Sequence, residues 1–567
     1  MSESVARLAA DKFVNKDYST ALRIYSDLSN AVGEKFFRLN IELCKKNLVN
    51  SGKCYSLCSY PNKKNVHITS NNLKSCSSFK VAMIADEFTY NSYKDEFTAI
   101  ALEPDTWQEQ LEKSKPDVFF CESAWAGLDS KRRPWRGQIY ASVRFQKENR
   151  TALIGILDYC KKNSIPTIFW NKEDPTHYMD RVHDFVKTSK MFDFVFTSAE
   201  ECVDKYKKEH GITNAFALPF ATNPRIFNPS GATHRSSSIV FAGSWYANHV
   251  QRSKDMEFIL DCLRNQGFDI EIYDRYYGES DPLHRWPDKY KSFLKPSKPH
   301  DCMPEVYKSS CFGLNFNTVI ESSTMFARRV FELMSCNTLV LSNYSRGVHE
   351  IFGDLVIFID REPSRLVAFS AKEIDSIREK ALNLVLSEHT YTNRWQKILS
   401  KIGIPFVPTD ERITPVAIIH TQQDATSAIA WFQQHGKALT DANLVLFIDK
   451  NHTDLEIARL YQEFNRCNIT VISARHAIDY GNVDTYRPIE TPIFALFDPQ
   501  KPPSVDWIKK ASLHLKYIHH YAIEPTSCNG MRYKVKIRSS SQTLVGFTSL
   551  FTQIVCAGNE PMYVYTV

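Results

Sequence analysis

The chain has 567 residues, of which 43% are hydrophobic and 13% aromatic, and its formal net charge is +6. At about 150 residues per domain, this length predicts three or four globular domains, and the apolar content excludes a largely disordered chain. The charge permits contact with anionic surfaces, but no Lys/Arg stripe interleaved with aromatic residues favours nucleic-acid binding.

The sequence also bears on the compartment. No segment approaches the roughly 18 uninterrupted apolar residues of a membrane-spanning helix, and the first residues lack a signal-peptide core. The 14 cysteines form no repeated CxxC pair, which favours reduced thiols over a zinc site. We therefore expect a cytoplasmic protein, at most peripheral at the inner face of the cell membrane, with no metal site.

The first 50 residues place apolar side chains at helical spacing and predict a helical hairpin with a third helix. The segment KDYSTALRIYSDL resembles a single tetratricopeptide-type unit, which would cap the next domain or contact a partner. Residues 51–78 are rich in Ser, Asn, Cys and Lys and are interpreted as a linker.

From residue 79 short apolar strands alternate with helical patterns, which is typical of doubly wound α/β domains. We expect one such domain over 79–230 and a second over 231–408, the latter closed by a helix around Tyr391–Leu399. The predicted strands are Lys80–Ala85, Asp117–Cys121, Thr167–Trp170, Asp193–Thr197 and Ala215–Leu218, then Ile239–Ala242, Asp269–Tyr273, Phe312–Phe316, Leu339–Ser342 and Val356–Ile359.

A third α/β pattern covers residues 409–567, after a Pro-containing joint near 405–415. Its predicted strands are Val416–His420, Leu444–Ile448, Ile469–Ile472 and Phe494–Leu496. It is expected to form a separate domain.

The segment from Ser323 to Gly347 carries the main chemical signal of the chain. Thr324 is placed to N-cap a helix that presents Arg329 and Glu332 on one face. An Arg near a helix N-terminus can neutralise a diphosphate, and a carboxylate one turn deeper can accept hydrogen bonds from a ribose diol. The alternative is an ordinary surface helix with an ion pair.

Polar residues at two strand ends extend this predicted nucleotide site. Glycine after a strand lets backbone amides approach a phosphate, and loops at the carboxyl ends of such strands bind ligands. Arg346 could instead pair with Glu350 on a solvated face. The full predicted set is Gly243, Ser244, Arg252, Thr324, Arg328, Arg329, Glu332, Tyr344, Ser345 and Arg346.

The first domain offers candidate catalytic groups, namely Glu173, Asp174 and His177 in the loop NKEDPTH and Asp86 at the end of the first strand. Carboxylates and imidazoles at strand ends can act as bases or bind sugar hydroxyls. The alternatives are structural: Asp174 as an N-cap with a proline at the first helical position, and Asp86 as a cap.

Nearby, Glu122 and Trp125 follow another strand, in the sequence CESAW, and could line the same pocket. Trp125 would offer a stacking platform for a sugar ring, or else be a core residue.

Residues 79–400 resemble the CgeB-like bacterial glycosyltransferases, which are related to group 1 glycosyltransferases. The resemblance rests on the blocks VAMIADEFTYNSY, PDVFFCESAW, IPTIFWNKEDPTHY, FDFVFTSAEECVDKY, ALPFATNPRIFNP, IVFAGSWYANHVQR and TMFARRVFELMSCNTLVLSNYSRGVHEIFGD. It implies a GT-B fold of two Rossmann-like domains, the first on the acceptor side and the second on the nucleotide-sugar donor side. It also implies transfer of a sugar from a nucleotide diphosphate-sugar to a cell-surface polysaccharide, glycolipid or protein acceptor, without a cofactor or metal.

The sequence departs from the group 1 pattern at one position. Many of these enzymes carry two glutamates separated by seven residues; Glu332 matches the second, whereas Thr324 stands at the first. The resemblance therefore supports Glu332 as a ribose ligand and leaves retention or inversion open, with a lean to retention by analogy.

The C-terminal domain resembles a degenerate family 2 (GT-A) glycosyltransferase domain. Of the Asp-any-Asp pair that holds a metal-diphosphate in that family, Asp498 remains and Gln500 replaces its partner. We therefore expect this domain to be non-catalytic.

Two other functions compete with sugar transfer. A dinucleotide-dependent oxidoreductase is disfavoured because no GxGxxG fingerprint follows a predicted first strand. A non-catalytic polysaccharide-binding or scaffold protein on a decayed GT-B fold is the alternative. The nucleotide base, the sugar, the acceptor and the oligomeric state are not specified by the sequence.

Overall fold

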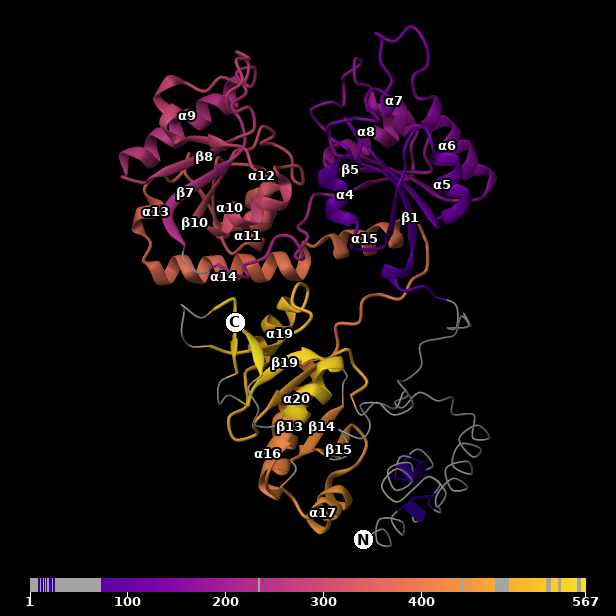
Figure 1. The fold of residues 1–567 in the computed structure, drawn as a ribbon, viewed down its shortest axis with the longest axis vertical. Coiled ribbons are helices and arrows are strands. Elements are labelled where there is room, and N and C mark those ends of the chain that lie inside the picture. Colours follow the sequence, from indigo (N-terminus) through magenta and orange to yellow (C-terminus); the bar gives the residue numbers. More distant parts are fainter. Residues whose placement is uncertain are drawn as a thin grey trace. The chain divides into compact units, whose positions relative to one another are not determined.

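The computed structural model describes residues 73–232, 235–439, 443–449, 451–474, 489–526, 532–538, 542–557 and 562–567, together with short stretches between residues 9 and 25. The chain divides into two compact units (Figure 1). One is Asn71–Thr409, and the other combines Met1–Ser70 with Asp410–Val567.

The first half of the unit Asn71–Thr409 is built on a six-stranded parallel sheet of order β2-β1-β3-β4-β5-β6. Its strands are β1 (Lys80–Ile84), β2 (Thr98–Ala101), β3 (Val118–Glu122), β4 (Thr167–Asn171), β5 (Phe194–Thr197) and β6 (Ala215–Ala217). The helices are α4 (Glu87–Tyr93), α5 (Trp107–Ser114), α6 (Thr151–Lys162), α7 (Phe185–Ser189) and α8 (Glu200–His210), and they surround the sheet in Figure 1. The strand order reverses between β1 and β3, and such switch points are where open α/β sheets bind ligands.

A second six-stranded parallel sheet follows, of order β12-β11-β10-β7-β8-β9. Its strands are β7 (Ser236–Ala242), β8 (Ile270–Asp274), β9 (Leu294–Pro296), β10 (Ser310–Asn315), β11 (Leu339–Ser342) and β12 (Val356–Phe358). The helices are α9 (Val250–Asn265), α10 (Met303–Lys308), α11 (Arg329–Ser335), α12 (Arg346–Phe352), α13 (Arg365–Ala368) and α14 (Ala371–Glu388). Here the order reverses between β7 and β10, which gives a second switch point.

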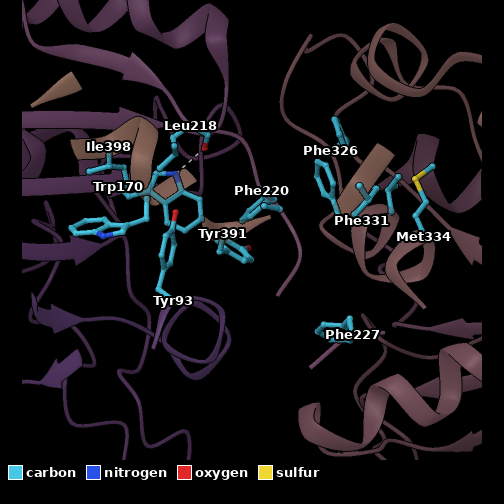
Figure 2. Close-up of a cluster of buried hydrophobic side chains, with 14 of the residues drawn as sticks. Tyr93, Trp170, Leu218, Phe220, Phe227, Phe326, Phe331, Met334, Tyr391 and Ile398 are labelled. Carbon is cyan, nitrogen blue, oxygen red and sulfur yellow. Dashed lines mark hydrogen bonds between the residues drawn. The ribbon is translucent and has the colours of Figure 1, made fainter. Parts of the chain in front are cut away.

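Helix α15 (Tyr391–Lys401) packs on the first half. The sequence-based prediction that this helix closes the second domain is therefore wrong. The ring of Trp395 lies 4.6 Å from that of Phe97, and its indole N–H donates to the Cys76 carbonyl at 3.0 Å. Tyr391 packs against Tyr93, which also contacts Trp170 (Figure 2). Because α14 leads directly into α15, the chain returns to its first half after completing the second sheet.

The other unit contains an eight-stranded mixed sheet of order β15-β14-β13-β16-β19-β17-β20-β18. Its strands are β13 (Ile413–Ile419), β14 (Leu444–Ile448), β15 (Ile469–Ser473), β16 (Ile493–Phe497), β17 (Ala522–Glu524), β18 (Lys534–Ile537), β19 (Leu544–Phe547) and β20 (Tyr563–Thr566). The described helices are α16 (Gln422–His435), α17 (Asp454–Phe464), α19 (Val505–His514) and α20 (Phe551–Ala557). The first four strands of the order are parallel, and β19 joins β16 antiparallel.

Most of the predicted N-terminal helical segment and linker lie outside the described residues. Of the part that is described, Ala9, Ala21 and Ile24 are buried in one apolar cluster with residues of β13 to β16. These described residues therefore pack with the C-terminal part of the chain. Within the described residues, no helix combines the length and the apolar composition needed to cross a membrane.

Candidate functional site

The second switch point gathers several of the predicted nucleotide-binding residues. Gly243 directly follows β7, and Asn315 ends β10 beside it in the sheet. A Cβ atom at Gly243 would come within 2.6 Å of the Phe241 ring and 3.1 Å of Arg329 Nη2. Glycine is therefore required here, because a larger residue would occupy the space in which the Arg329 side chain lies.

Two arginines meet at this point. Arg329 opens α11, stacks over the Phe241 ring at 4.9 Å and donates to Asn315 Oδ1 at 3.3 Å. Arg252, in the first turn of α9, is 7% exposed and donates to the Ser244 carbonyl at 3.1 Å. Elements far apart in sequence thus bring two guanidinium groups to one strand end.

Neither arginine has a carboxylate partner among the described residues. Burial and the neighbouring charge of Arg329 lower the pKa of Arg252 to about 10, so that it remains charged at neutral pH. Two like charges in a desolvated place are unfavourable unless an anion joins them. This arrangement fits a phosphate or diphosphate.

Three buried polar atoms of residues that follow β7 and β11 or open α11 have no hydrogen-bond partner within the described part of the chain. They are Ser244 Oγ, Ser345 Oγ and Arg329 Nε. Buried polar groups are otherwise almost always paired, and an orphaned group points to a missing ligand or water. All three belong to residues that the sequence analysis placed in the nucleotide site.

A network of buried amides holds the loop before α11. Asn317 Oδ1 accepts from the Ala327 backbone N–H at 2.9 Å and from Asn315 Nδ2 at 3.1 Å. Asn343 Oδ1 accepts from the Asn317 backbone N–H at 2.8 Å. Sequence reasoning did not single out Asn315 and Asn317, although their position at the carboxyl end of a predicted strand was a usable signal.

Thr324 does not N-cap the helix, which corrects the sequence-based interpretation. Helix α11 begins at Arg329, five residues later. The Thr324 hydroxyl instead donates to the Ser198 carbonyl at 2.8 Å and accepts from the Glu200 backbone N–H at 2.9 Å. Thr324 therefore ties the loop to the start of α8 in the first half and takes no part in the predicted cap.

Glu332 and Arg328 form a partly buried ion pair. Glu332 is 5% exposed and accepts from Arg328 Nε at 2.7 Å, while the Tyr307 hydroxyl lies 3.4 Å from its other oxygen. Arg328 in turn stacks over the Phe88 ring of the first half at 4.6 Å. The contacts of Glu332 are thus separate from those of Arg329, and its role as a ribose ligand stays a prediction.

The loop after β11 is only partly as expected. The Tyr344 backbone N–H donates to Asp360, and Arg361 stacks over the Tyr344 ring at 4.8 Å. Arg346 pairs with Glu350 at 2.8 Å in an exposed position, which is the alternative considered for it. Such exposed ion pairs contribute little to stability. To reach a ligand, the Arg346 side chain would have to leave Glu350 and rotate.

At the first switch point Lys172 lies among three carboxylates. Its ammonium is 3.0 Å from Asp86, 3.3 Å from Glu122 and 3.9 Å from Glu173. Burial alone would lower the pKa of Lys172, but these carboxylates raise it, so that the lysine stays charged. The cluster joins the carboxyl ends of β1, β3 and β4.

Asp86 and Glu122 are held differently within this cluster. Burial favours a raised pKa for Asp86, but Lys172 and the backbone N–H groups of residues 125–127 outweigh it and lower the pKa. Burial raises the pKa of Glu122 to about 7, against the opposing effect of Lys172. An Asp86 carboxylate with this many donors is a weak base, and its contacts suit a positioning role.

Glu173 is the acidic group of this set with the greatest access to solvent. It is 23% exposed, and its Oε1 accepts from the Trp125 indole N–H at 2.9 Å. Trp125 is partly buried against Tyr140 and Phe185, so it is neither a fully buried core residue nor a free platform.

Asp174 is a buried structural residue, which corrects its assignment as a catalytic group. It is fully buried and accepts from the hydroxyls of Thr197 and Tyr206, at 2.7 and 3.0 Å, and from Asn171 Nδ2. No helix begins at Asp174, so its alternative role as an N-cap is also excluded. A carboxyl enclosed in this way cannot contact a substrate.

His177 lies at the end of the same loop, with its Nδ1 at 3.0 Å from Asp180. The pKa of His249, which precedes α9, is lowered by burial and by the charges of Arg252 and His177. His177 therefore lies within electrostatic range of His249 at the start of α9.

In the C-terminal domain the amide of Gln500 donates to Asp424 at 2.6 Å, and its backbone N–H donates to Asp498.

The chain is similar to known proteins in part of its length. Residues 252–400, which include Arg252, Arg329 and Glu332, match the family model described as "Glycosyl transferase-like". No curated protein matches the chain. The family match places a glycosyltransferase-like sequence on the half that contains the two arginines.

Solved structures with a similar fold include an α-glucosyltransferase in complex with UDP (11% identity, 57% of this chain and 100% of that chain, TM-score 0.41). Others are Anabaena HepE in complex with UDP-glucose (12%, 57% and 99%, TM-score 0.37) and a glycosyltransferase from Rickettsia africae (10%, 58% and 98%, TM-score 0.37).

Proposed function

We propose that the protein is a glycosyltransferase of the GT-B type that moves a sugar from a nucleotide diphosphate-sugar to a polysaccharide, glycolipid or protein acceptor. The observation that carries this proposal is the pair Arg252 and Arg329, which has no carboxylate partner among the described residues. The family match over residues 252–400 supports the same conclusion independently.

The donor diphosphate would bind at the end of β7. Guanidinium groups form paired, charge-assisted hydrogen bonds with phosphate oxygens, and the bare Gly243 leaves room for them. The two arginines would supply the positive charge that a divalent ion supplies in metal-dependent transferases, so the donor would bind without a metal. Glu332 would accept hydrogen bonds from the ribose once Arg328 turns toward the ligand.

The acceptor would bind at the carboxyl ends of β1, β3 and β4. Glu173 would accept a hydrogen bond from the reacting hydroxyl, and the edge of Trp125 would hold this carboxylate in place. Asp86, Glu122 and Lys172 would fix the surrounding backbone rather than react. Closure of the two halves around the donor would exclude water and so limit hydrolysis.

A panel of nucleotide sugars tests this function, with the melting temperature and the release of nucleoside diphosphate measured in parallel. Ligand binding to the native state raises the apparent stability, so the correct donor should raise the melting temperature. Stabilisation together with slow release of the diphosphate would support the transferase.

The second candidate is a non-catalytic polysaccharide-binding or scaffold protein, favoured by the absence of the first glutamate of the group 1 pair at Thr324. In that case nucleotide sugars should neither stabilise the protein nor be turned over, whereas a polysaccharide would bind. This outcome would overturn the proposed transfer activity.

A further inference from the structure

The loop between β4 and α7 brings together two histidines and an aspartate. The Nδ1 atoms of His177 and His183 both lie 3.0 Å from the same oxygen of Asp180, Oδ2. Within the described part of the chain, this is the one group of three His, Cys, Asp or Glu side chains whose possible ligand atoms all lie within 4.8 Å of one another. The transfer chemistry proposed above does not require such a cluster.

The spacing of these atoms suits a small divalent transition-metal ion. Zinc binds imidazole nitrogen and carboxylate oxygen at about 2.0–2.2 Å, which in a tetrahedral site puts neighbouring ligand atoms roughly 3.3–3.5 Å apart. The 3.0 Å separations from Asp180 need only a small expansion to reach this geometry. Two imidazoles and one carboxylate are also a ligand set that zinc and related ions use in proteins.

Surrounding groups already orient the three side chains. The other oxygen of Asp180 accepts from the backbone N–H groups of Val182 and His183, at 2.8 and 3.1 Å. The Trp125 ring packs edge-on against both imidazoles, with centroid distances of 5.3 Å to His177 and 5.1 Å to His183. Such fixed surroundings lower the cost of ordering the ligands when an ion binds.

We propose that His177, Asp180 and His183 form a binding site for a divalent transition-metal ion, with zinc as the expected occupant. Each imidazole would shift its proton from Nδ1 to Nε2 and give the Nδ1 lone pair to the ion, so no proton is lost. The side chains are 29%, 22% and 35% exposed, which leaves a further coordination position open to water or a ligand hydroxyl.

The ion would fix the loop that carries Glu173. The loop runs from the end of β4 at Asn171 to the start of α7 at Phe185, and the His177 backbone N–H donates to the Glu173 carbonyl at 3.0 Å. His177 and His183 lie at the two ends of residues 177–183, so an ion bound to both would hold this segment rigid. The proposed ion is distinct from the donor site, where Arg252 and Arg329 provide the charge.

Zinc binding to the full-length protein, stripped of metal with a chelator, tests the site without any nucleotide. Titration against a chromophoric chelator should show one more zinc equivalent in the wild type than in Asp180→Asn or His183→Ala. Loss of an outer-shell partner weakens metal binding by about 10–100-fold. Loss of a direct ligand, as in either variant, should weaken zinc binding by at least as much.

A matched control is His284→Ala, because His284 makes the same 3.0 Å contact to Asp281, three residues before it, but has no second histidine on that oxygen. It should bind as much zinc as the wild type. Cobalt provides a second measurement: the lost equivalent should show the visible bands of a low-symmetry Co²⁺ site without thiolate charge transfer, which separates it from the cysteines. Zinc should also raise the melting temperature of the wild type more than that of either ligand variant.

Equal zinc binding by the wild type and both ligand variants would overturn the site, as would a cobalt spectrum with thiolate bands for the equivalent that is lost. If both variants melt below the metal-free wild type, His177→Gln provides a milder change. Binding of as much zinc by His177→Gln as by the wild type would equally overturn the proposal.

Discussion

If Arg252 and Arg329 bind the donor diphosphate as proposed, they are held ready for it at a cost to the stability of the free protein. Two guanidinium groups without carboxylate partners repel one another, and Arg329 Nε is buried without a hydrogen bond within the described residues. Replacing one of them with a neutral side chain removes the repulsion. The melting temperature of the free protein should therefore be unchanged or higher in Arg329→Gln, as measured by calorimetry.

Arg264→Gln is the control for that comparison, because Arg264 lies in the last turn of α9, the helix that carries Arg252, and is half exposed beside Asp261. It should leave the melting temperature within error of the wild type. A large loss of stability in Arg329→Gln alone would mean that Arg329 is a structural residue and not one reserved for a ligand.

Asp174 should make stability depend on pH. Burial raises its pKa from 3.8 to about 7, so the folded state binds a proton more firmly than the unfolded chain. Stability from this group is fully present below about pH 4 and is lost as the pH rises toward 7, by at most about 4 kcal/mol. Relative to Asp174→Asn, the wild-type melting temperature should fall between pH 4.5 and pH 8, as followed by circular dichroism.

Parallel pH profiles for the two proteins would contradict this role of Asp174. The comparison with the variant removes the contribution of Glu122, whose pKa is raised in the same direction.

Single residues were predictable where their chemistry depends on position along one strand or helix. Gly243, Ser244 and Arg252 were identified because they follow a strand and open a helix, and the structure brings Arg329 to them. Thr324 and Asp174 were misread because their partners lie far away in sequence. Thr324 bonds to residues 124 and 126 positions away, and Asp174 bonds to Thr197 and Tyr206, which no local pattern indicates.

Among the elements, the turn at the end of β7 should tolerate no side chain. Gly243→Ala places a Cβ atom 2.6 Å from the Phe241 ring and 3.1 Å from Arg329, so the arginine must move. We expect a stability loss of about 1–3 kcal/mol from overpacking, together with at least tenfold weaker nucleoside diphosphate binding. Isothermal titration calorimetry on the folded variant measures the second effect.

Gly155→Ala separates the two effects. Its Cβ atom would lie 2.7 Å from the Trp107 ring, a comparable clash within the first half and away from both arginines. It should lose similar stability and bind the nucleotide normally. Equal weakening of nucleotide binding by both substitutions would show that Gly243 acts only through general destabilisation.

The apolar runs predicted the strands that contain buried residues. Every strand predicted between residues 79 and 400 overlaps an observed one, including the edge strands β6 and β12, and the central parallel strands are the clearest because they are buried on both faces. β2 and β9 were missed because they are short edge strands with little or no buried residue, and β9 ends in proline. Helix α15 was recognised as a helix, but only its long-range contact with Phe97 assigns it to the first half.

At the scale of the whole molecule, the unit Asn71–Thr409 contains both switch points and every residue proposed to bind donor or acceptor. A fragment of residues 71–409 should therefore fold and bind nucleoside diphosphate with the affinity of the full chain, within about threefold. Calorimetry on the two proteins checks this. A folded fragment that binds more than tenfold more weakly would place part of the nucleotide site in the other unit.

The tandem α/β organisation followed from the alternation of strands and helices, but the packing of N-terminal residues with the C-terminal sheet did not. Ala9, Ala21 and Ile24 share a core with residues more than 390 positions away. A helical period identifies the buried face of a helix, whereas the surface that covers it depends on tertiary packing. The strands β17 to β20 of the C-terminal sheet were also missed, because each is only three or four residues long.

Binding of a nucleotide diphosphate to Arg252 and Arg329 can be measured directly. Titration calorimetry would compare a nucleoside, its monophosphate and its diphosphate, for each common base, on the wild type, Arg329→Gln and the control Arg264→Gln. We predict that the diphosphate of one base binds most tightly, that Arg329→Gln weakens it by about 10–100-fold, and that Arg264→Gln leaves it unchanged. Diphosphate binding that is no tighter than nucleoside binding, or that survives Arg329→Gln intact, would show that these arginines do not form a diphosphate site.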